Sequence, residues 1–260
     1  MNMKNALKVF SSVLIVAALA VVSGCKKEEK TPSAPAPASA QVKKLVMATD
    51  ATFPPYEYMK DSKIAGIDPE IVGEIAAKLG YVLEIKNMKF DDLIPAVQSR
   101  SADVAASGIT MTADRRKLVN FTVPYVTASQ VIIIPKDSTI KAPVELRGKR
   151  IGVQRRTMGD LYVREHIIEP ERFENGNLAV EALRAGKLDA VVLDSEPARV
   201  HTLEHPDEIM ILPIALTQEE YAFALNKDNT KLLKEFNDEL IKMRASGRLQ
   251  QIIDKYLKQK

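Results

Sequence analysis

The sequence contains no Trp, and aromatic residues make up only 5% of its 260 residues. An aromatic side chain at a predicted cleft is therefore worth attention. Cys25 is the single Cys, so the chain cannot form an intramolecular disulfide. The sequence also lacks a Walker phosphate loop, a dinucleotide-binding glycine fingerprint and a Cys and His set with zinc-ligand spacing. We expect no cofactor and no metal.

A large excess of one charge is also absent. The 37 Lys and Arg residues outnumber the 34 Asp and Glu residues by three, and Lys4 and Lys8 lie in a segment that we expect to be removed. Basic residues are interspersed with acidic ones and form no stripe, so we expect no nucleic-acid partner.

The N-terminal apolar run, Val9–Val22, follows Lys4 and Lys8. It is too short for a comfortable transmembrane helix and is typical of a secretory signal peptide, which we place at residues 1–24. No later run reaches transmembrane length. The run ends in Val22-Ser-Gly-Cys25, which resembles a lipoprotein cleavage motif, although that motif more often has Leu at the place of Val22. The resemblance implies that Cys25 is lipidated; the alternative is a plain secreted protein.

The segment from Lys26 to Gln41 contains charges, Pro and small residues but no large apolar side chain. Such a segment cannot bury enough surface to offset its ordering entropy. We therefore assign residues 25–42 to a disordered tether and begin the folded body at residue 43.

The folded body opens with alternating predicted strands and helices. Asp68-Pro-Glu is typical of a helix start with Asp68 as the N-cap, and Ile71, Ile75 and Leu79 give this helix one apolar face before Gly80 ends it. The order strand, helix, strand, helix, strand predicts parallel pairing with crossover helices. The expected strands are 45–49, 81–88 and 104–106, and the second expected helix contains Leu93, Ile94 and Val97.

The same order restarts downstream with a strand over 150–154 and a capping box from Thr157 to Asp160. Residues 182–194 repeat the layout of residues 96–108: a helix end, a turn, an Asp, a short strand and a polar group or Gly at its carboxyl end. This likeness predicts two lobes of similar plan. A strand over 221–225 and helices over 229–245 and 248–257 are expected to return to the first lobe.

Polar or aromatic residues follow the carboxyl ends of these strands, where ligands bind in open α/β sheets. They should therefore line one cleft between the lobes. Arg115 adds a planar fork that suits a carboxylate, and its alternative role is a surface ion pair. The expected cleft residues at strand ends are Asp50, Phe90, Ser107, Thr110, Gln154 and Asp194.

The chain from about residue 43 to residue 256 resembles the extracellular solute-binding proteins of family 3, which serve polar amino acid ABC transporters. The resemblance rests on four stretches in the same order: Ala48–Glu57, Gly66–Ile71, Asp103–Arg115 and Gly186–Asp194. It implies an α/β, two-lobed periplasmic binding protein fold (type II, Venus flytrap) with hinge strands near 125–129 and 218–222. The implied lobes are 43–127 with 220–260, and 128–219.

The resemblance also implies how a free amino acid is held. Arg115, with backbone N–H groups near Thr110 and Thr157, would bind the α-carboxylate. Asp194, with the Gly108 carbonyl and the hydroxyl of Ser107 or Thr110, would bind the α-ammonium.

The side chain of the ligand would lie between Phe53 and Phe90, with Asp50 at its far end. The alternative for Phe90 is a simple core position. An acid near two aromatic faces suits a cation, so we expect arginine or lysine. Gln154 suits glutamine equally well, and an acidic or other polar ligand stays open because Arg156 stands where the family usually has Gly. We expect the Arg156 side chain to point into solvent.

The predicted function is that of a monomeric substrate-binding lipoprotein of an amino acid ABC importer, anchored at the periplasmic or extracellular face and delivering its ligand to a membrane permease. Ligand binding would favour a closed form over an open one. One alternative is a dehydratase-type enzyme on the same fold, with Glu57, His166 and Asp194 as candidate acids or bases. Another is a receptor subunit that senses the ligand.

Overall fold

The computed structural model describes residues 43–258. The predicted signal peptide (1–24), the tether (25–42) with Cys25, and the last two residues of the expected first lobe lie outside the described residues. Within residues 43–258, no helix combines the length and the apolar character that a membrane crossing requires.

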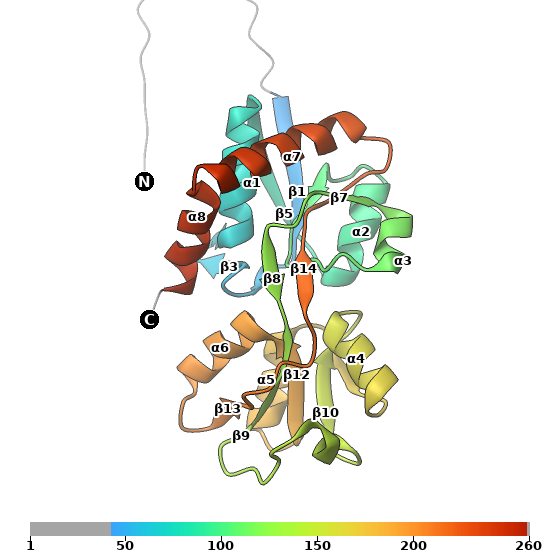
Figure 1. The fold of residues 1–260 in the computed structure, drawn as a ribbon, viewed down its shortest axis with the longest axis vertical. Coiled ribbons are helices and arrows are strands. Elements are labelled where there is room, and N and C mark those ends of the chain that lie inside the picture. Colours follow the sequence, from blue (N-terminus) through green and yellow to red (C-terminus); the bar gives the residue numbers. More distant parts are fainter. Residues whose placement is uncertain (1–42, 259–260) are drawn as a thin grey trace, which may run out of the picture. The chain divides into compact units, whose positions relative to one another are not determined.

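The first sheet has five strands in the order β5-β1-β6-β15-β7. β1 (Lys43–Thr49) pairs in parallel with both β5 (Tyr81–Asn87) and β6 (Val104–Ala105). The helices α1 (Ile67–Lys78) and α2 (Phe90–Gln98) are the crossovers, and this confirms the predicted parallel arrangement (Figure 1). The antiparallel strands β7 (Asn120–Phe121) and β15 (Ala224–Leu225) complete the sheet.

The start of α1 differs from the prediction. The N-cap is Gly66, whereas the Asp68 carboxylate is fully buried and accepts the N–H of Gly108 at 3.1 Å. A Cβ at position 66 would lie 2.1 Å from the Tyr56 carbonyl oxygen, so only Gly permits this approach. The close approach packs α1 against a small antiparallel sheet of three short strands. They are β2 (Thr52–Phe53), β3 (Glu57–Lys60) and β4 (Lys63–Ala65).

The second sheet has the order β11-β10-β12-β9-β13. β10 (Ile151–Gln154) pairs in parallel with β11 (Glu171–Phe173) and β12 (Ala190–Asp194), as the repeated plan predicts. β9 (Gln130–Pro135) and β13 (Ile209–Ile211) join it as an antiparallel pair. Helices cover both faces, so the central strands are continuous apolar runs. These helices are α4 (Met158–His166), α5 (Gly176–Arg184) and α6 (Ser195–Glu204), with a short 3-10 turn at Pro143–Leu146.

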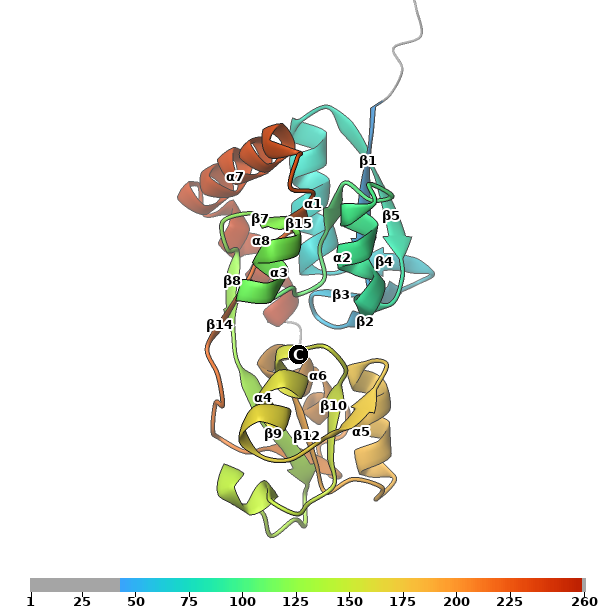
Figure 2. The same cartoon turned by 90° about the vertical axis from the view of Figure 1, so that its right-hand side faces the viewer.

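Two strands connect the lobes. β8 (Val126–Ala128) pairs antiparallel with β14 (Glu219–Tyr221), and Figures 1 and 2 show this ribbon running between the two sheets. The expected single strand over 221–225 is wrong, because the chain leaves the hinge after Tyr221 and then enters the first sheet as β15. The lobe boundaries that we propose fall within β8 and β14.

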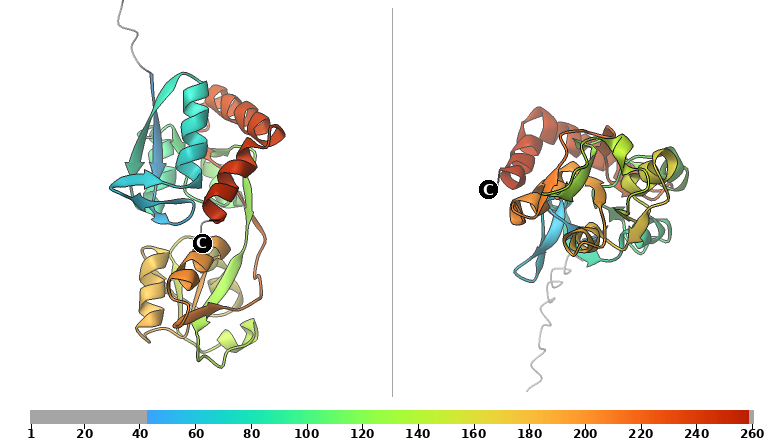
Figure 3. Two further views of the ribbon diagram at one scale, coloured as in Figure 1. Left: turned by 90° about the vertical axis from the view of Figure 1, so that its left-hand side faces the viewer. Right: turned by 90° about the horizontal axis from the view of Figure 1, so that it is seen from below.

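The C-terminal helices return to the first lobe. α7 (Thr230–Ala245) and α8 (Arg248–Leu257) lie beside α1 (Figure 3), where Phe236 and Ile252 share a buried core with Ile71 and Ile75. The predicted pair of terminal helices is confirmed. A third short helix, α3 (Ala113–Leu118), follows the turn after β6.

The two sequence repeats share the same hydrogen bonds. Asp103 accepts the backbone N–H of Val46 at 2.7 Å, and Asp189 accepts the backbone N–H of Arg150 at 2.8 Å. In each repeat the Asp thereby bonds to the backbone of the neighbouring parallel strand, in the middle of β1 and directly before β10. The repeated Asp is therefore a structural signal that places the carboxyl ends of both short strands at the cleft.

Candidate functional site

All ten residues predicted to bind the ligand line one pocket. Both lobes contribute side chains. The lining residues are Asp50, Phe53, Phe90, Ser107, Gly108, Thr110, Arg115, Gln154, Thr157 and Asp194, together with Met158, which was not predicted.

Asp50 follows β1 and is almost fully buried. Its carboxylate accepts the Thr52 hydroxyl at 2.9 Å and the Phe90 N–H at 3.2 Å. Burial raises the pKa of Asp50, these two hydrogen bonds oppose the rise, and the charges of Glu174 and Asp91 add to it. A cation close to this carboxylate would relieve part of that unfavourable environment.

The turn after β6 brings Ser107 and Gly108 to the pocket. Ser107 Oγ accepts the Asp50 N–H at 3.1 Å, so the ends of two neighbouring strands are connected. Gly108 has a left-handed φ of +52°, and a Cβ there would lie 2.8 Å from the Phe53 ring. Glycine is therefore required both for the turn and for the aromatic contact.

Arg115 lies on α3, and its guanidinium donates to two carbonyl oxygens. The contacts are with Thr110 at 3.0 Å and, from the other lobe, with Arg156 at 2.9 Å. Its guanidinium also lies 5.2 Å from the centre of the Phe90 ring. Burial lowers the pKa of Arg115, while the charges of Glu219 and Asp194 oppose the change. A guanidinium carries five N–H donors, so donors remain for a ligand carboxylate.

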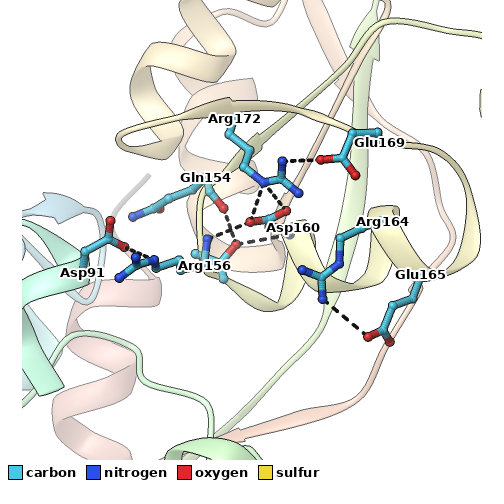
Figure 4. Close-up of polar contacts among 9 residues, drawn as sticks. Asp91, Gln154, Arg156, Asp160, Arg164, Glu165, Glu169 and Arg172 are labelled. Atoms are coloured by element: carbon cyan, nitrogen blue, oxygen red, sulfur yellow. Dashed lines mark hydrogen bonds and ion pairs between the residues drawn. The ribbon is translucent and has the colours of Figure 1, made fainter.

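The second lobe presents the N-terminus of α4. Thr157 is the N-cap and accepts the Asp160 N–H at 3.5 Å, which confirms half of the predicted capping box. The other half differs, because the Asp160 carboxylate accepts the N–H of Arg156 at 2.9 Å and pairs with Arg172 (Figure 4). The first turn of a helix favours a negative group, and Thr157 lines the pocket there.

Arg156 has a left-handed φ of +60°, a conformation that Gly adopts without cost. Its side chain is 74% exposed and lies 3.8 Å from Asp91, so the expected solvated orientation is confirmed. The side chain does not line the pocket.

Asp194 is the last residue of β12 and is buried. Its carboxylate accepts the Tyr221 hydroxyl. Burial, helped by the charge of Glu219, raises its pKa to about 7, against the opposing hydrogen bond from Tyr221. Arg115 is a cation close enough to interact with Asp194, yet the pKa of Asp194 stays raised. A ligand ammonium would therefore add a favourable partner for the ionised carboxylate.

Glu219 and Tyr221, both on the hinge strand β14, were missed by the sequence analysis. Glu219 is buried and accepts hydroxyls from Thr110 and Thr217, each at 2.7 Å. The two acids of the short segment Glu219-Glu-Tyr221 are visible in the sequence, but the burial of Glu219 is not, and most acids in a sequence are exposed. Met158 gave no signal either, because an apolar residue in a first helical turn is ordinary.

Contacts between the lobes close one side of the pocket. Arg155 Nε lies 2.7 Å from Asp91 Oδ2, and Lys89 Nζ lies 3.0 Å from Glu174 Oε2. Both pairs join the start of α2 with loops of the second lobe. Together with the Arg115 contact to Arg156, they join the two lobes.

The three candidate acids or bases of the enzyme alternative are not brought together. Asp194 lines the pocket, whereas Glu57 is fully buried behind it and His166 packs on Tyr162. Among residues 43–258, no cluster of His, Cys, Asp or Glu is arranged to hold a metal ion.

The sequence model of the bacterial extracellular solute-binding proteins, family 3, matches residues 45–259. The chain belongs to this family. Family 3 proteins of known name are similar to it over most of their length. The arginine-binding extracellular protein ArtP of Bacillus subtilis is 32% identical over 82% of this chain and 86% of ArtP. A probable histidine-binding protein of Neisseria gonorrhoeae is 32% identical over 98% of this chain and 96% of its own.

A solved family 3 structure gives the same result for the fold. The arginine-bound form of a truncated ArgBP from T. maritima is 38% identical, covers 76% of this chain and 95% of its own, and superposes with a TM-score of 0.74. The predicted two-lobed α/β fold is therefore confirmed.

Proposed function

We propose that this family 3 protein is the substrate-binding lipoprotein of an amino acid ABC importer and that it captures a basic amino acid, arginine or lysine. The observation that carries the choice of ligand is the charge around the pocket. Asp50, Asp194 and Glu219 are buried acids, and Arg115 is the one cation that lines the pocket. An amino acid with a cationic side chain has the net positive charge that this surplus favours.

The geometry supports a role for each end of the ligand. Arg115 and the start of α4 at Thr157 suit the α-carboxylate, because both present N–H donors to the pocket. Asp194 suits the α-ammonium. The ligand side chain would extend between Phe53 and Phe90 toward Asp50, and the arginine-bound relative ArgBP agrees with a cationic ligand.

Calorimetric titration tests the proposal. The protein is unfolded and refolded to remove any bound ligand and is then titrated with each of the twenty amino acids and ornithine. We expect one-to-one binding that is tightest for arginine or lysine. Tight binding of glutamine, which the buried amide of Gln154 would favour, would keep the binding function and refute the assigned ligand. No binding across the panel would refute the function itself.

The anchor and the permease belong to the same proposal. Lipidation of Cys25 is expected to place the mature protein in the membrane fraction of cells, and Cys25→Ala is expected to abolish this. A soluble wild-type protein in the same fractionation would contradict the anchor. Loss of arginine uptake in a deletion strain, restored by the wild-type chain, distinguishes transport from sensing.

A further inference from the structure

Behind the pocket, Glu57 and Asp68 form a pair of acids that the proposed function does not use. Glu57 lies on β3 and Asp68 in the first turn of α1, and both side chains are 0% exposed. The two acids bond to the consecutive residues Ser107 and Gly108, and each acts on the pKa of the other. The other charged group near Glu57 is Asp50, which is also acidic.

One oxygen of each acid is used by the pocket. Ser107 Oγ donates to Glu57 Oε1 at 2.8 Å, and the Gly108 N–H donates to Asp68 Oδ2 at 3.1 Å. The second oxygens, Glu57 Oε2 and Asp68 Oδ1, have no hydrogen-bond partner among residues 43–258, and neither does the hydroxyl of Tyr125, which faces Asp68 and can donate to it. Two ionised carboxylates are acceptors only, so they would repel each other and leave Glu57 Oε2 unsatisfied even when Tyr125 donates to Asp68. A single proton between the two acids removes the repulsion and supplies the missing donor.

We propose that Glu57 and Asp68 share one proton and act as a positioning pair that fixes Ser107 and Gly108 at the ligand pocket. The proposal rests on the proposed function, in which the Gly108 carbonyl accepts from the ligand ammonium. The pair reaches further along the pocket, because Ser107 Oγ also accepts the Asp50 N–H at 3.1 Å. The pair therefore fixes Ser107 and Gly108 and, through Ser107, also the backbone of Asp50.

The surroundings favour the protonated form of the pair. Burial raises the pKa of Glu57 well above its ordinary value, and the neighbouring charge of Asp68 adds to the rise. Burial also raises the pKa of Asp68, although hydrogen bonds oppose it. Besides Asp50, the titratable groups that face the pair are the phenols of Tyr56 and Tyr125, whose pKa values burial also raises. These phenols are neutral at ordinary pH, so none of these neighbours supplies a positive charge.

The shared proton has a measurable consequence. The folded protein keeps a proton that the unfolded chain releases near the ordinary Glu pKa of 4.5. Stability contributed by this proton is full below that pH and is lost as the pH rises toward the raised folded pKa. Glu57→Gln removes the titration but keeps the hydrogen bonds, because an amide can accept from Ser107 and donate to Asp68.

The test compares Glu57→Gln, Glu57→Leu and the exposed control Glu220→Gln with the wild type. Relative to the wild type, the melting temperature of ligand-free Glu57→Gln is expected to rise steadily between about pH 5 and pH 8, whereas Glu220→Gln gives a flat difference. Ligand affinity should stay within about threefold for Glu57→Gln and fall about tenfold or more for Glu57→Leu, which removes the acceptor of Ser107.

Each result decides one part of the proposal. A flat difference for Glu57→Gln would refute the shared proton, and unimpaired affinity in Glu57→Leu would refute the positioning role. If Glu57→Leu does not fold, Glu57→Gln tests the positioning role instead. A loss of affinity of more than tenfold in a correctly folded Glu57→Gln would show that an amide cannot replace the protonated acid, and this would refute the proposed hydrogen bonds of the pair. The melting series needs no ligand, so failure of the wild type to bind any amino acid refutes the proposed function separately.

Discussion

The two repeats of the molecule have the same backbone plan and end in different chemistry. The turn after β6 contains Gly108, which permits a close contact with the Phe53 ring, whereas β12 ends in Asp194, which contributes a buried acid. Both short strands are positioned by the same bond from a preceding Asp to the neighbouring strand. The scaffold therefore sets where a group stands, and the residue at the strand end sets what it can bind. Substitutions at equivalent positions can separate these two contributions.

The largest effect is expected from Asp194→Asn. Leaving a ligand ammonium without its buried partner costs about 2 to 5 kcal/mol of binding free energy, or roughly 30-fold to 5,000-fold in affinity. Without ligand, the variant should be as stable as the wild type or more stable, because burial already disfavours the charge. Calorimetric titration and thermal unfolding measure the two effects. The control is Asp189→Asn at the other end of β12, and equal losses in both variants would contradict a role specific to Asp194.

The charge of Asp194 should also make binding depend on pH. Its raised pKa of about 7 means that about half of the ligand-free protein carries the proton at pH 7. Binding of an ammonium favours the ionised form, so the affinity should rise about tenfold per pH unit below pH 7 and level off above it. The stability of the ligand-free protein changes in the opposite direction, falling as the pH rises from the ordinary Asp value of 3.8 to about 7.

Proton release upon binding checks this expectation. Titrations at pH 7 in two buffers with different ionisation enthalpies should report the release of about half a proton. Asp194→Asn should release none if it still binds measurably. Proton uptake by the wild type, or an affinity that does not change between about pH 5.5 and pH 7, would show that Asp194 is already ionised before the ligand arrives.

A smaller effect is expected at the two repeated aspartates. Asp103→Ala leaves the partly buried N–H of Val46 without a partner, which costs about 1 to 3 kcal/mol of unfolding free energy. Asp189→Ala leaves the exposed N–H of Arg150 to water and also removes an exposed ion pair, so its cost should be below about 1 kcal/mol. Urea unfolding gives the two values. A larger cost for Asp189→Ala than for Asp103→Ala would contradict this ranking of the two bonds by burial.

The parts of the site that sequence could predict are those that local pattern determines. Each short strand is marked by its apolar residues and the Asp before it, so the residues at the strand ends could be assigned to one cleft. Asp68 was assigned wrongly because Asp before Pro at a helix start is usually an N-cap. Its burial depends on the β2–β4 sheet folding back onto α1, which no local pattern shows.

Glu219 was missed for a related reason. Its carboxylate is drawn into the site by Thr110, which lies far away in the sequence, through the pairing of hinge strand β14 with the turn after β6. Pairing between distant segments is decided by tertiary packing, so a single sequence indicates the hinge strand but not the direction in which its charged side chain points.

The smallest effect distinguishes the turns of the two repeats. Arg100 and Gly186 occupy equivalent turn positions and both are left-handed, with φ of +62° and +70°. A Cβ at Gly186 would meet no atom within 4 Å, so Gly186→Ala adds only backbone strain and should cost about 1 kcal/mol of unfolding free energy. Arg100→Gly relieves the same strain but gives the unfolded chain more freedom, and it also removes an exposed ion pair with Asp228. We therefore expect it to stabilise the fold by less than about 1 kcal/mol, without change in affinity. Urea unfolding of both variants measures the two changes in unfolding free energy. Destabilisation of similar size in both variants would mean that the Arg100 side chain, not the backbone strain, determines the stability of the first turn.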